Sequence, residues 1–385
     1  MDLSLEAYRD IVKNVGNRAD IATLCRVSKG FQYAAQRALY NTLYMRHTHT
    51  TVLLCRTLAE QPRLAELVDA LTISLTDEDD LSDDDSDVAV FDDDNPPLLQ
   101  EFWPAVASAL KNTICLRYLN IHINNRAEAY LAWMFRDCNF RLRSFHCDLE
   151  WDRDLVSFLN TQVDLDDLYL IDYKDLDEDT PTTVSMASHS HSQLLSTSLP
   201  NLSTLECTFS EAAMALVPGR PITHLKSCFS RSDPDGKRAE ISLLFSKLRR
   251  SKRHLKSLDI ADSSYTEEFS IELLRHVVSI NATTTDLRYL GTLVLPIDGR
   301  ERLQFYGLLM RLPRIQSIEV EVSDWKPPPS SVPAFRALAM ELRLYCPTVT
   351  RIVFVHDFDR TVVSVMNGIC VIDSDISTDM LWSEA

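Results

Sequence analysis

The chain has 385 residues, of which 45% are hydrophobic and 25% are charged, and its formal net charge is −17. This composition is typical of a folded, water-soluble protein and excludes a wholly disordered chain, while the negative charge disfavours nucleic acid as a partner. No run is long and apolar enough to span a bilayer, and acidic residues interrupt the start of the chain where a signal peptide needs its apolar core. We therefore expect a cytoplasmic protein that binds neither membrane nor nucleic acid.

The first predicted elements are short helices with more apolar surface than they can bury among themselves. The first helix carries one apolar stripe at helical spacing, formed by Leu5, Tyr8, Val12 and Val15 with Ile11 beside it. Asp20 is expected to cap a second helix and Ser28 a third. Part of this apolar surface is predicted to bind a partner. The alternative is that the helices only cap the first strand of the region that follows.

An acidic run follows at Asp77–Asp94. It contains eleven carboxylates, so the rest of the chain carries a formal charge of only −6. Such a run repels itself and cannot pack, and we therefore predict a disordered surface loop over residues 76–95. Two alternatives remain: a segment that attracts a basic partner, and a phosphorylation site at Ser82, which precedes three aspartates.

Short apolar runs of the form L-x-x-L-x-L recur through the rest of the chain, separated by helix-like stretches. Their central residues are Leu71, Leu119, Phe145, Leu168, Leu205, Leu225, Leu258, Leu290, Ile318 and Ile352. A strand of this kind cannot bury its face alone, whereas stacked strands with helices behind them share one continuous core. The pattern predicts α/β architecture in the form of an irregular leucine-rich-repeat solenoid over residues 48–385, a curved parallel sheet with helices on its outer face. The alternative is an ordinary α/β sheet of strand–helix units.

On each strand, the side chains that alternate with the buried ones are expected to face an open surface. The candidate substrate-binding residues on this surface are Tyr118, Asn120, His146, Asp148, Tyr169, Glu206, Asp259 and Glu319. The set is polar, contains aromatic rings and leans acidic, so a protein of basic or mixed character fits it better than a small apolar ligand. The alternative is a strand face that contacts only solvent.

The basic cluster Lys247–Lys256 is expected to end a helix just before a strand, where cations complement the carbonyl end of the helix dipole. The alternative is a nuclear-import signal, which would add the nucleus to the predicted location.

A β-hairpin is predicted near the end of the chain. Asn367 and Gly368 lie between two β-branched runs, which is the strongest short signal for a two-residue type I′ turn. We expect strands at Thr361–Met366 and Ile369–Asp373, which would cover the last edge of the sheet. A further repeat helix is the alternative, although Val-Val-Ser-Val is a poor helix sequence.

The sequence contains no motif for catalysis or metal binding. G-x-S-x-G, H-E-x-x-H and the phosphate-binding loop are absent, and the alternating histidines at 46–50 and 189–192 lack neighbouring ligands at metal spacing. The nine cysteines include no C-x-x-C pair and are predicted to be reduced, with Cys147 and Cys207 buried in strands. We therefore expect no enzyme activity, no cofactor and no metal.

The first 47 residues resemble an F-box. The positions that carry this resemblance are Leu3, Leu5, Ile11, Val15, Ile21, Leu24, Val27, Ser28, Phe31, Leu39 and Tyr40. Ser4 stands where the motif usually has a proline. With the downstream repeats, the chain is similar to fungal F-box/leucine-rich-repeat proteins.

This resemblance implies a three-helix module at residues 1–47 that binds a Skp-type adaptor and, through it, a cullin. The residues implied at the adaptor are Leu3, Leu5, Tyr8, Ile11, Val12 and Val27. The protein is then expected to be the substrate-recognition subunit of a Skp-cullin-F-box-type ubiquitin ligase, with an unknown protein substrate on the repeat surface. The alternative is a non-catalytic leucine-rich-repeat scaffold with a degenerate F-box that is not coupled to ubiquitination.

Overall fold

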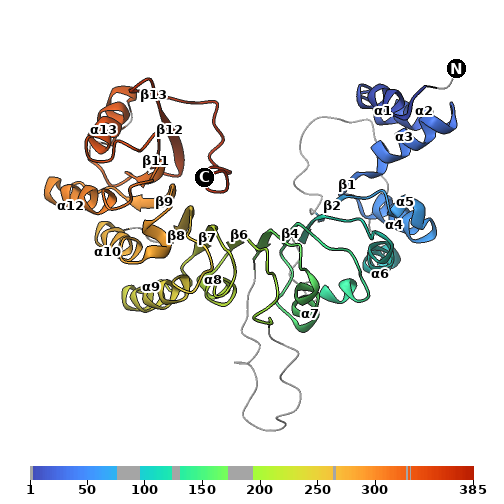
Figure 1. The fold of residues 1–385 in the computed structure, drawn as a ribbon, viewed down its shortest axis with the longest axis horizontal. Coiled ribbons are helices and arrows are strands. Elements are labelled where there is room, and N and C mark those ends of the chain that lie inside the picture. The colour runs from blue at the N-terminus through green and yellow to red at the C-terminus, as the bar shows by residue number, and fades with distance from the viewer. Residues whose placement is uncertain are drawn as a thin grey trace, which may run out of the picture. The chain divides into compact units, whose positions relative to one another are not determined.

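The computed structural model describes residues 3–75, 96–123, 131–171, 194–262, 266–326, 328–329 and 331–385. The chain divides into two compact units, Met1–Leu199 and Pro200–Ala385, and each is described by itself. Helices alternate with strands in both (Figure 1). The predicted acidic loop at 76–95, with Ser82, lies outside the described residues. In the part of the chain that is described, no helix combines the length and apolar character needed to cross a membrane.

The first unit begins with three helices, α1 (Leu5–Lys13), α2 (Arg18–Leu24) and α3 (Lys29–Tyr40). Each helix is capped by a side chain that accepts a hydrogen bond from the backbone of the first turn, at Ser4, Asn17 and Ser28. Ser28 acts as predicted. Asp20 does not cap α2, because Asn17 starts this helix earlier and places Asp20 in its first turn.

The described residues of the first unit then form five strands, and each pairs in parallel with the next of the five along the chain. They are β1 (Thr42–Met45), β2 (Ala70–Leu75), β3 (Tyr118–Ile123), β4 (Ser144–Cys147) and β5 (Asp167–Leu170). The connecting elements are α4 (Thr48–Glu60), α5 (Pro62–Ala65), α6 (Pro96–Asn112), the 3₁₀ helix η3 (Ala132–Phe135) and α7 (Arg153–Thr161). The predicted central residues from Leu71 to Leu168 pair in register and are buried. Strand β1 was not predicted, and it joins the sheet directly after α3, inside the range assigned to the helical module.

The second unit continues the alternation. Its strands are β6 (Thr204–Cys207), β7 (His224–Cys228), β8 (Ser257–Ala261), β9 (Tyr289–Val294), β10 (Ser317–Glu321), β11 (Arg351–His356), β12 (Asp359–Met366) and β13 (Ile369–Ile372). Its helices are α8 (Ser210–Leu216), α9 (Pro234–Leu248), α10 (Glu267–Val277), α11 (Asn281–Thr284), α12 (Gly299–Leu309) and α13 (Val332–Tyr345). Strands β6 to β11 pair in parallel, and the predicted central residues from Leu205 to Ile352 lie in register and are buried. The expected α/β architecture with a mostly parallel sheet is therefore confirmed.

The helices of the second unit start and pack as their sequences dictate. Asp233, Thr266, Asp298 and Ser331 each cap the following helix through a side-chain oxygen. Helix α10 buries a face of residues at helical spacing, including Ile271, Leu274 and Val277. The basic cluster Lys247–Lys256 spans the end of α9 and the connection to β8, as expected.

The C-terminal hairpin is confirmed. Strands β12 and β13 are antiparallel, and the two turn residues Asn367 and Gly368 have φ values of 52° and 82°. A second hairpin, which was not predicted, joins β11 to β12 through Asp357 and Phe358, both also with positive φ. Asp-Phe lacks the glycine that marks such turns, so the sequence carried little signal for it.

Replacing Gly368 with valine is expected to reduce the free energy of unfolding by about 1–2 kcal/mol. The cost comes from the backbone alone, because a Cβ atom at this position would meet no other atom within 4 Å. Gly368→Asn is the matched control, since asparagine tolerates positive φ, and it should be close to wild type. Urea unfolding of the three proteins measures the difference, and equal stability of the valine and asparagine variants would contradict the turn assignment.

Candidate functional site

The helical module α1–α3 is held together by a small apolar core. Val12 is buried against Ala34 and Ala35 of α3, and the ring of Tyr8 contacts Phe31 edge-on, with centroids 4.7 Å apart. Gly30 makes room for this ring, because a Cβ atom there would lie 2.6 Å from Tyr8 Cζ. Two of the six predicted adaptor residues, Tyr8 and Val12, therefore pack within the module rather than on its open surface.

The other four predicted adaptor residues are exposed. Their exposed fractions are 48% for Leu3, 44% for Leu5, 40% for Ile11 and 61% for Val27. Leu3 and Leu5 flank the start of α1, and Val27 lies in the turn between α2 and α3. The module thus buries one side of its first helix and leaves apolar side chains of another side in contact with solvent.

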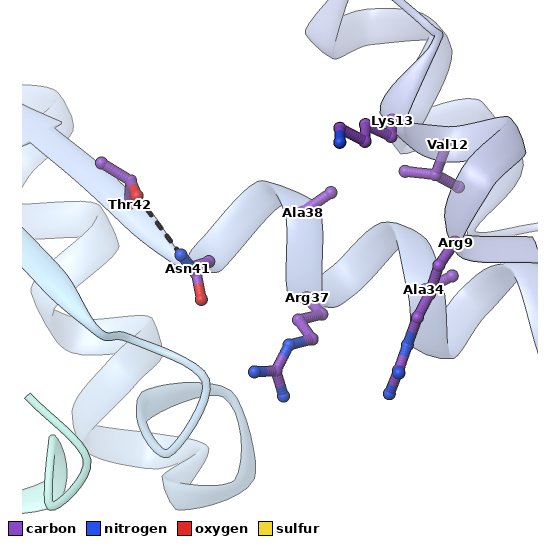
Figure 2. A pocket seen from close by; sticks show the side chains of 8 residues that line it. All are labelled: Arg9, Val12, Lys13, Ala34, Arg37, Ala38, Asn41 and Thr42. Atoms are coloured by element: carbon purple, nitrogen blue, oxygen red, sulfur yellow. Dashed lines mark hydrogen bonds between the residues drawn. The ribbon is translucent and has the colours of Figure 1, made fainter. Parts of the chain in front are cut away.

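A basic pocket of about 520 Å³ lies between α1, α3 and the start of β1 (Figure 2). Arg9, Lys13 and Arg37 contribute three cations to its lining, and Val12 and Ala34 contribute apolar atoms. No carboxylate lines the pocket. Sequence reasoning missed this site, although Arg9 and Lys13, four residues apart on one helix, were a signal for a shared basic face.

The strand face of the first unit is polar and rich in tyrosine. Residues of the five neighbouring strands β1 to β5 lie in one register row, which consists of Tyr44, Thr72, Asn120, His146 and Tyr169. The rings of His146 and Tyr169 are 5.8 Å apart, and Tyr44 and the neighbouring Tyr118 are exposed. Three predicted substrate-binding residues, Asn120, His146 and Tyr169, are therefore brought into one row, with Tyr118 beside them, as the alternation of strand side chains predicts.

On the same face, the Asp167 carboxylate binds two neighbouring polar side chains. His146 Nε2 lies 2.8 Å from Asp167 Oδ2, and Ser144 Oγ donates to this oxygen at 2.7 Å. In a nucleophile–base pair the serine hydroxyl would instead bond to the imidazole. Asp167 therefore orients the Ser144 and His146 side chains on a polar surface. The nearby Asp148 accepts a hydrogen bond from the backbone N–H of Ile123. Partial burial raises the pKa of the Asp148 carboxyl above its ordinary value.

The strand face of the second unit differs from its prediction. Glu206 is partly exposed and pairs with Lys226 at 2.8 Å. In contrast, Asp259 and Glu319 are only 9% and 1% exposed, so the expectation that they face an open surface is wrong. Glu319 accepts hydrogen bonds from the hydroxyls of Tyr289, at 2.6 Å, and Thr292, at 3.1 Å.

The chain itself covers this face. Leu381 and Trp382, from the segment 374–385 after β13, pack with Tyr289, Val353 and Val362. Tyr289, Val353 and Val362 belong to β9, β11 and β12, and Val353 and Val362 are direct register partners. The two carboxylates were expected to be open because the repeat pattern contains no information about this later segment.

Asp259 and Glu319 form a buried acidic cluster. Burial raises the pKa of Asp259 to about 7, and the negative charge of Glu319 adds to the effect, while Lys226 and Arg360 oppose it. Arg360 Nη2 lies 3.6 Å from Glu319. Gly291 allows Asp259 this position, because a Cβ atom on residue 291 would lie 2.8 Å from Asp259 Cα.

We expect Asp259→Asn to stabilise the protein at pH 8 and to have little effect at pH 4. The raised pKa means that the folded state binds the proton more tightly than the unfolded state, so wild-type stability falls as pH rises from about 4 through 7. A difference of about three pKa units corresponds to at most about 4 kcal/mol at pH 8. Urea unfolding of both proteins from pH 4 to pH 8 tests this, and a variant whose stability relative to wild type does not change with pH would refute it.

Within the described ranges, no group of three or more His, Cys, Asp or Glu side chains is placed to hold a metal ion. The alternating histidines at 189–192 lie outside these ranges. Cys147 and Cys207 are buried as predicted, and burial raises the pKa of each thiol to about 12, which makes both weak nucleophiles at neutral pH.

In comparisons with known proteins, no family model matches the chain and no curated sequence shows significant similarity to it.

Proposed function

We propose that this protein is a substrate-recognition subunit of a Skp-cullin-F-box-type ubiquitin ligase. In this proposal the module α1–α3 binds a Skp-type adaptor, and strand side chains of the following region bind a protein substrate. The observation that carries the proposal is the exposure of Leu3, Leu5, Ile11 and Val27 on a module whose interior is already filled by other residues. Exposed apolar groups that the fold does not need are typical of a partner-binding surface.

The apolar contacts alone would give a weak complex. Covering the exposed part of each of these four side chains contributes about 1 kcal/mol, or about 4 kcal/mol in total. A micromolar complex needs about 8 kcal/mol after the entropic cost of association is met. Polar contacts must supply the difference, and Arg9, Lys13 and Arg37 on the same module are suited to an acidic adaptor surface.

Ser4 is compatible with this role. Proline at the start of an F-box helix fixes the backbone for the first turn, and Ser4 starts α1 by another route, accepting a hydrogen bond from Ala7 N at 3.2 Å. The helix can therefore begin at the same place without proline.

For the substrate, the polar row on the first unit is a suitable surface. Tyr44, Tyr118 and Tyr169 can bury large rings at a low entropic cost, while the Asp167 carboxylate and His146 offer directional hydrogen bonds. This combination suits a protein surface of mixed character.

Co-purification of the intact chain with a Skp-type adaptor tests the proposal. We expect a stoichiometric complex that survives gel filtration. If a correctly folded chain does not bind the adaptor, the alternative is favoured: a non-catalytic interaction scaffold whose degenerate F-box is not coupled to ubiquitination. The specific observation behind that alternative is the replacement of the motif's proline by Ser4.

A further inference from the structure

The segment 374–385 lies on the second unit in the manner of a bound peptide. It forms turns but no helix or strand, and Leu381 and Trp382 are buried while Asp379, Met380 and Glu384 around them are exposed. A short stretch with two adjacent buried side chains and exposed neighbours is typical of a peptide anchored at a hot spot.

The receiving surface is built from several strands and has both apolar and polar contacts. Tyr289, Val353 and Val362 form its apolar part. Lys226 Nζ lies 5.6 Å from the centre of the Trp382 ring, at the distance of a cation–π contact. His224 Nε2 donates to the backbone carbonyl of Ala385 at 3.0 Å. These contacts recognise an aromatic ring and a backbone group, and neither requires that the peptide belong to the same chain.

We propose that this strand face is a binding site for a peptide that presents an adjacent aliphatic–aromatic pair on a turn, and that Leu381 and Trp382 occupy it in cis. A partner protein that presents such a pair displaces the segment. The inference rests on the proposed function in treating the strand face as the partner-binding surface, but it does not depend on adaptor binding.

Because the chain's own segment occupies the site, a partner must exceed a minimum affinity to displace it. A segment tethered a few residues from its site has an effective concentration in the millimolar range, so a free peptide of equal intrinsic affinity is strongly outcompeted. The intact chain should therefore bind only partners with additional contacts, while a chain with a vacated site should bind the isolated segment.

The test is a titration with a fluorescent peptide of sequence 374–385. The full chain carrying Leu381→Ala and Trp382→Ala should bind this peptide at least tenfold more tightly than the wild-type chain does. A control peptide with the same two alanine substitutions should bind the variant at least tenfold more weakly than the native peptide. Failure of the folded variant to bind the native peptide would overturn the proposal.

A second form of the protein keeps the test decisive if the double variant does not fold. A protease site is inserted between Asp373 and Ser374, the chain is folded with its segment in place, and the segment is then cut. Exchange of the cut segment for labelled peptide supports a binding site, whereas a cut segment that does not exchange, or a chain that unfolds on cutting, shows that it is part of the core. Neither variant alters Leu5 or Ile11, so adaptor co-purification of the same samples reports separately on the proposed function.

Discussion

The double substitution Leu5→Asp and Ile11→Asp is expected to abolish adaptor binding, with a loss of more than a hundredfold in affinity. Both side chains are exposed in the free protein, so the charges cost little there. In a complex that covers them, each unpaired carboxylate would lose its hydration at a cost of several kcal/mol. Titration calorimetry with a purified Skp-type adaptor measures the loss, and the thermal unfolding of the variant should match that of wild type.

Matched controls separate a docking surface from a general effect of surface charge. Leu344→Asp and Met340→Asp on α13 place charges at exposed apolar positions in the other unit, and Leu344 is 81% exposed. These variants should bind the adaptor normally. Val12→Asp, which puts a charge inside the module, should unfold it. If the Leu5/Ile11 variant melts as the Val12 variant does, its residues serve internal packing and the docking assignment fails.

Lys237→Met is expected to reduce the free energy of unfolding by about 3–5 kcal/mol. Lys237, on α9, forms a buried ion pair with Asp262, and its ammonium group also lies 5.4 Å from the ring centre of Phe269. Removing the ammonium leaves the buried Asp262 carboxylate without this countercharge. Replacing both partners, with Lys237→Met and Asp262→Leu, should restore much of the loss, because an apolar pair of similar volume avoids the desolvation penalty.

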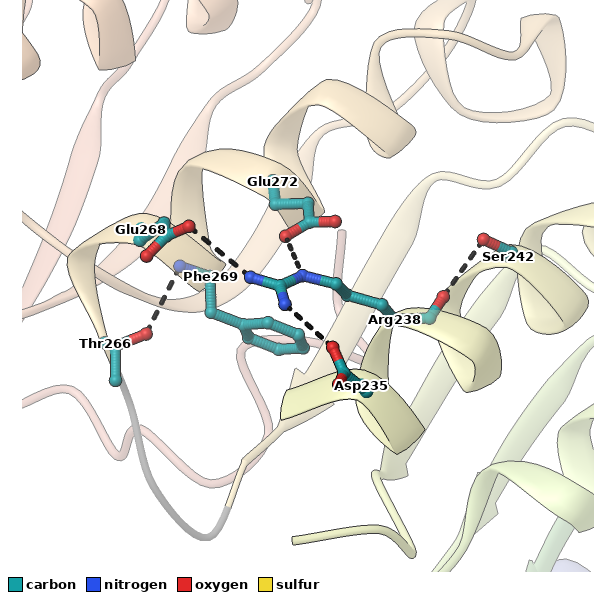
Figure 3. A network of polar contacts seen from close by, with 7 residues as sticks. All are labelled: Asp235, Arg238, Ser242, Thr266, Glu268, Phe269 and Glu272. Atoms are coloured by element: carbon teal, nitrogen blue, oxygen red, sulfur yellow. Dashed lines mark hydrogen bonds and ion pairs between the residues drawn. The ribbon is translucent and has the colours of Figure 1, made fainter. Parts of the chain in front are cut away.

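The neighbouring Arg238 provides the control for this experiment. Figure 3 shows its guanidinium between Asp235, Glu268 and Glu272, with contacts of 3.0–3.4 Å across α9 and α10. Asp235 and Glu268 are largely exposed, and exposed ion pairs contribute little because water screens them. Arg238→Met should therefore be far less destabilising than Lys237→Met in urea unfolding. Equal losses of unfolding free energy in the two variants would show that burial does not determine how much each cation contributes to stability.

The parallel strands could be predicted because their signal is local and repeated. Residues such as Leu119, Leu225 and Ile318 recur within similar short patterns, and each proved to be a buried, in-register strand residue. The turn at Asn367–Gly368 was predictable because few residue pairs accept positive φ at both positions. Asp357–Phe358 adopts the same kind of conformation without that composition, so its hairpin was missed.

The candidate sites were harder to predict because burial depends on segments distant in sequence. Alternation places Asp259 and Glu319 on one face of the strands, but only packing of Leu381 and Trp382 on that side reveals that the face is covered. Helical spacing likewise placed Val12 in an apolar stripe without showing which part of the stripe faces inward. The small residues of α3, including Ala35, were the available signal, since they allow two helices to approach closely.

Hydrogen exchange of the intact chain, with and without a saturating Skp-type adaptor, tests the central claim most directly. We predict that the adaptor slows exchange of backbone amides in α1 and in the α2–α3 connection around Val27, while β7 to β10 exchange at the same rate in both samples. Binding without protection of residues 3–28, or with protection confined to the strands, would contradict the assignment of the helical module as the docking surface.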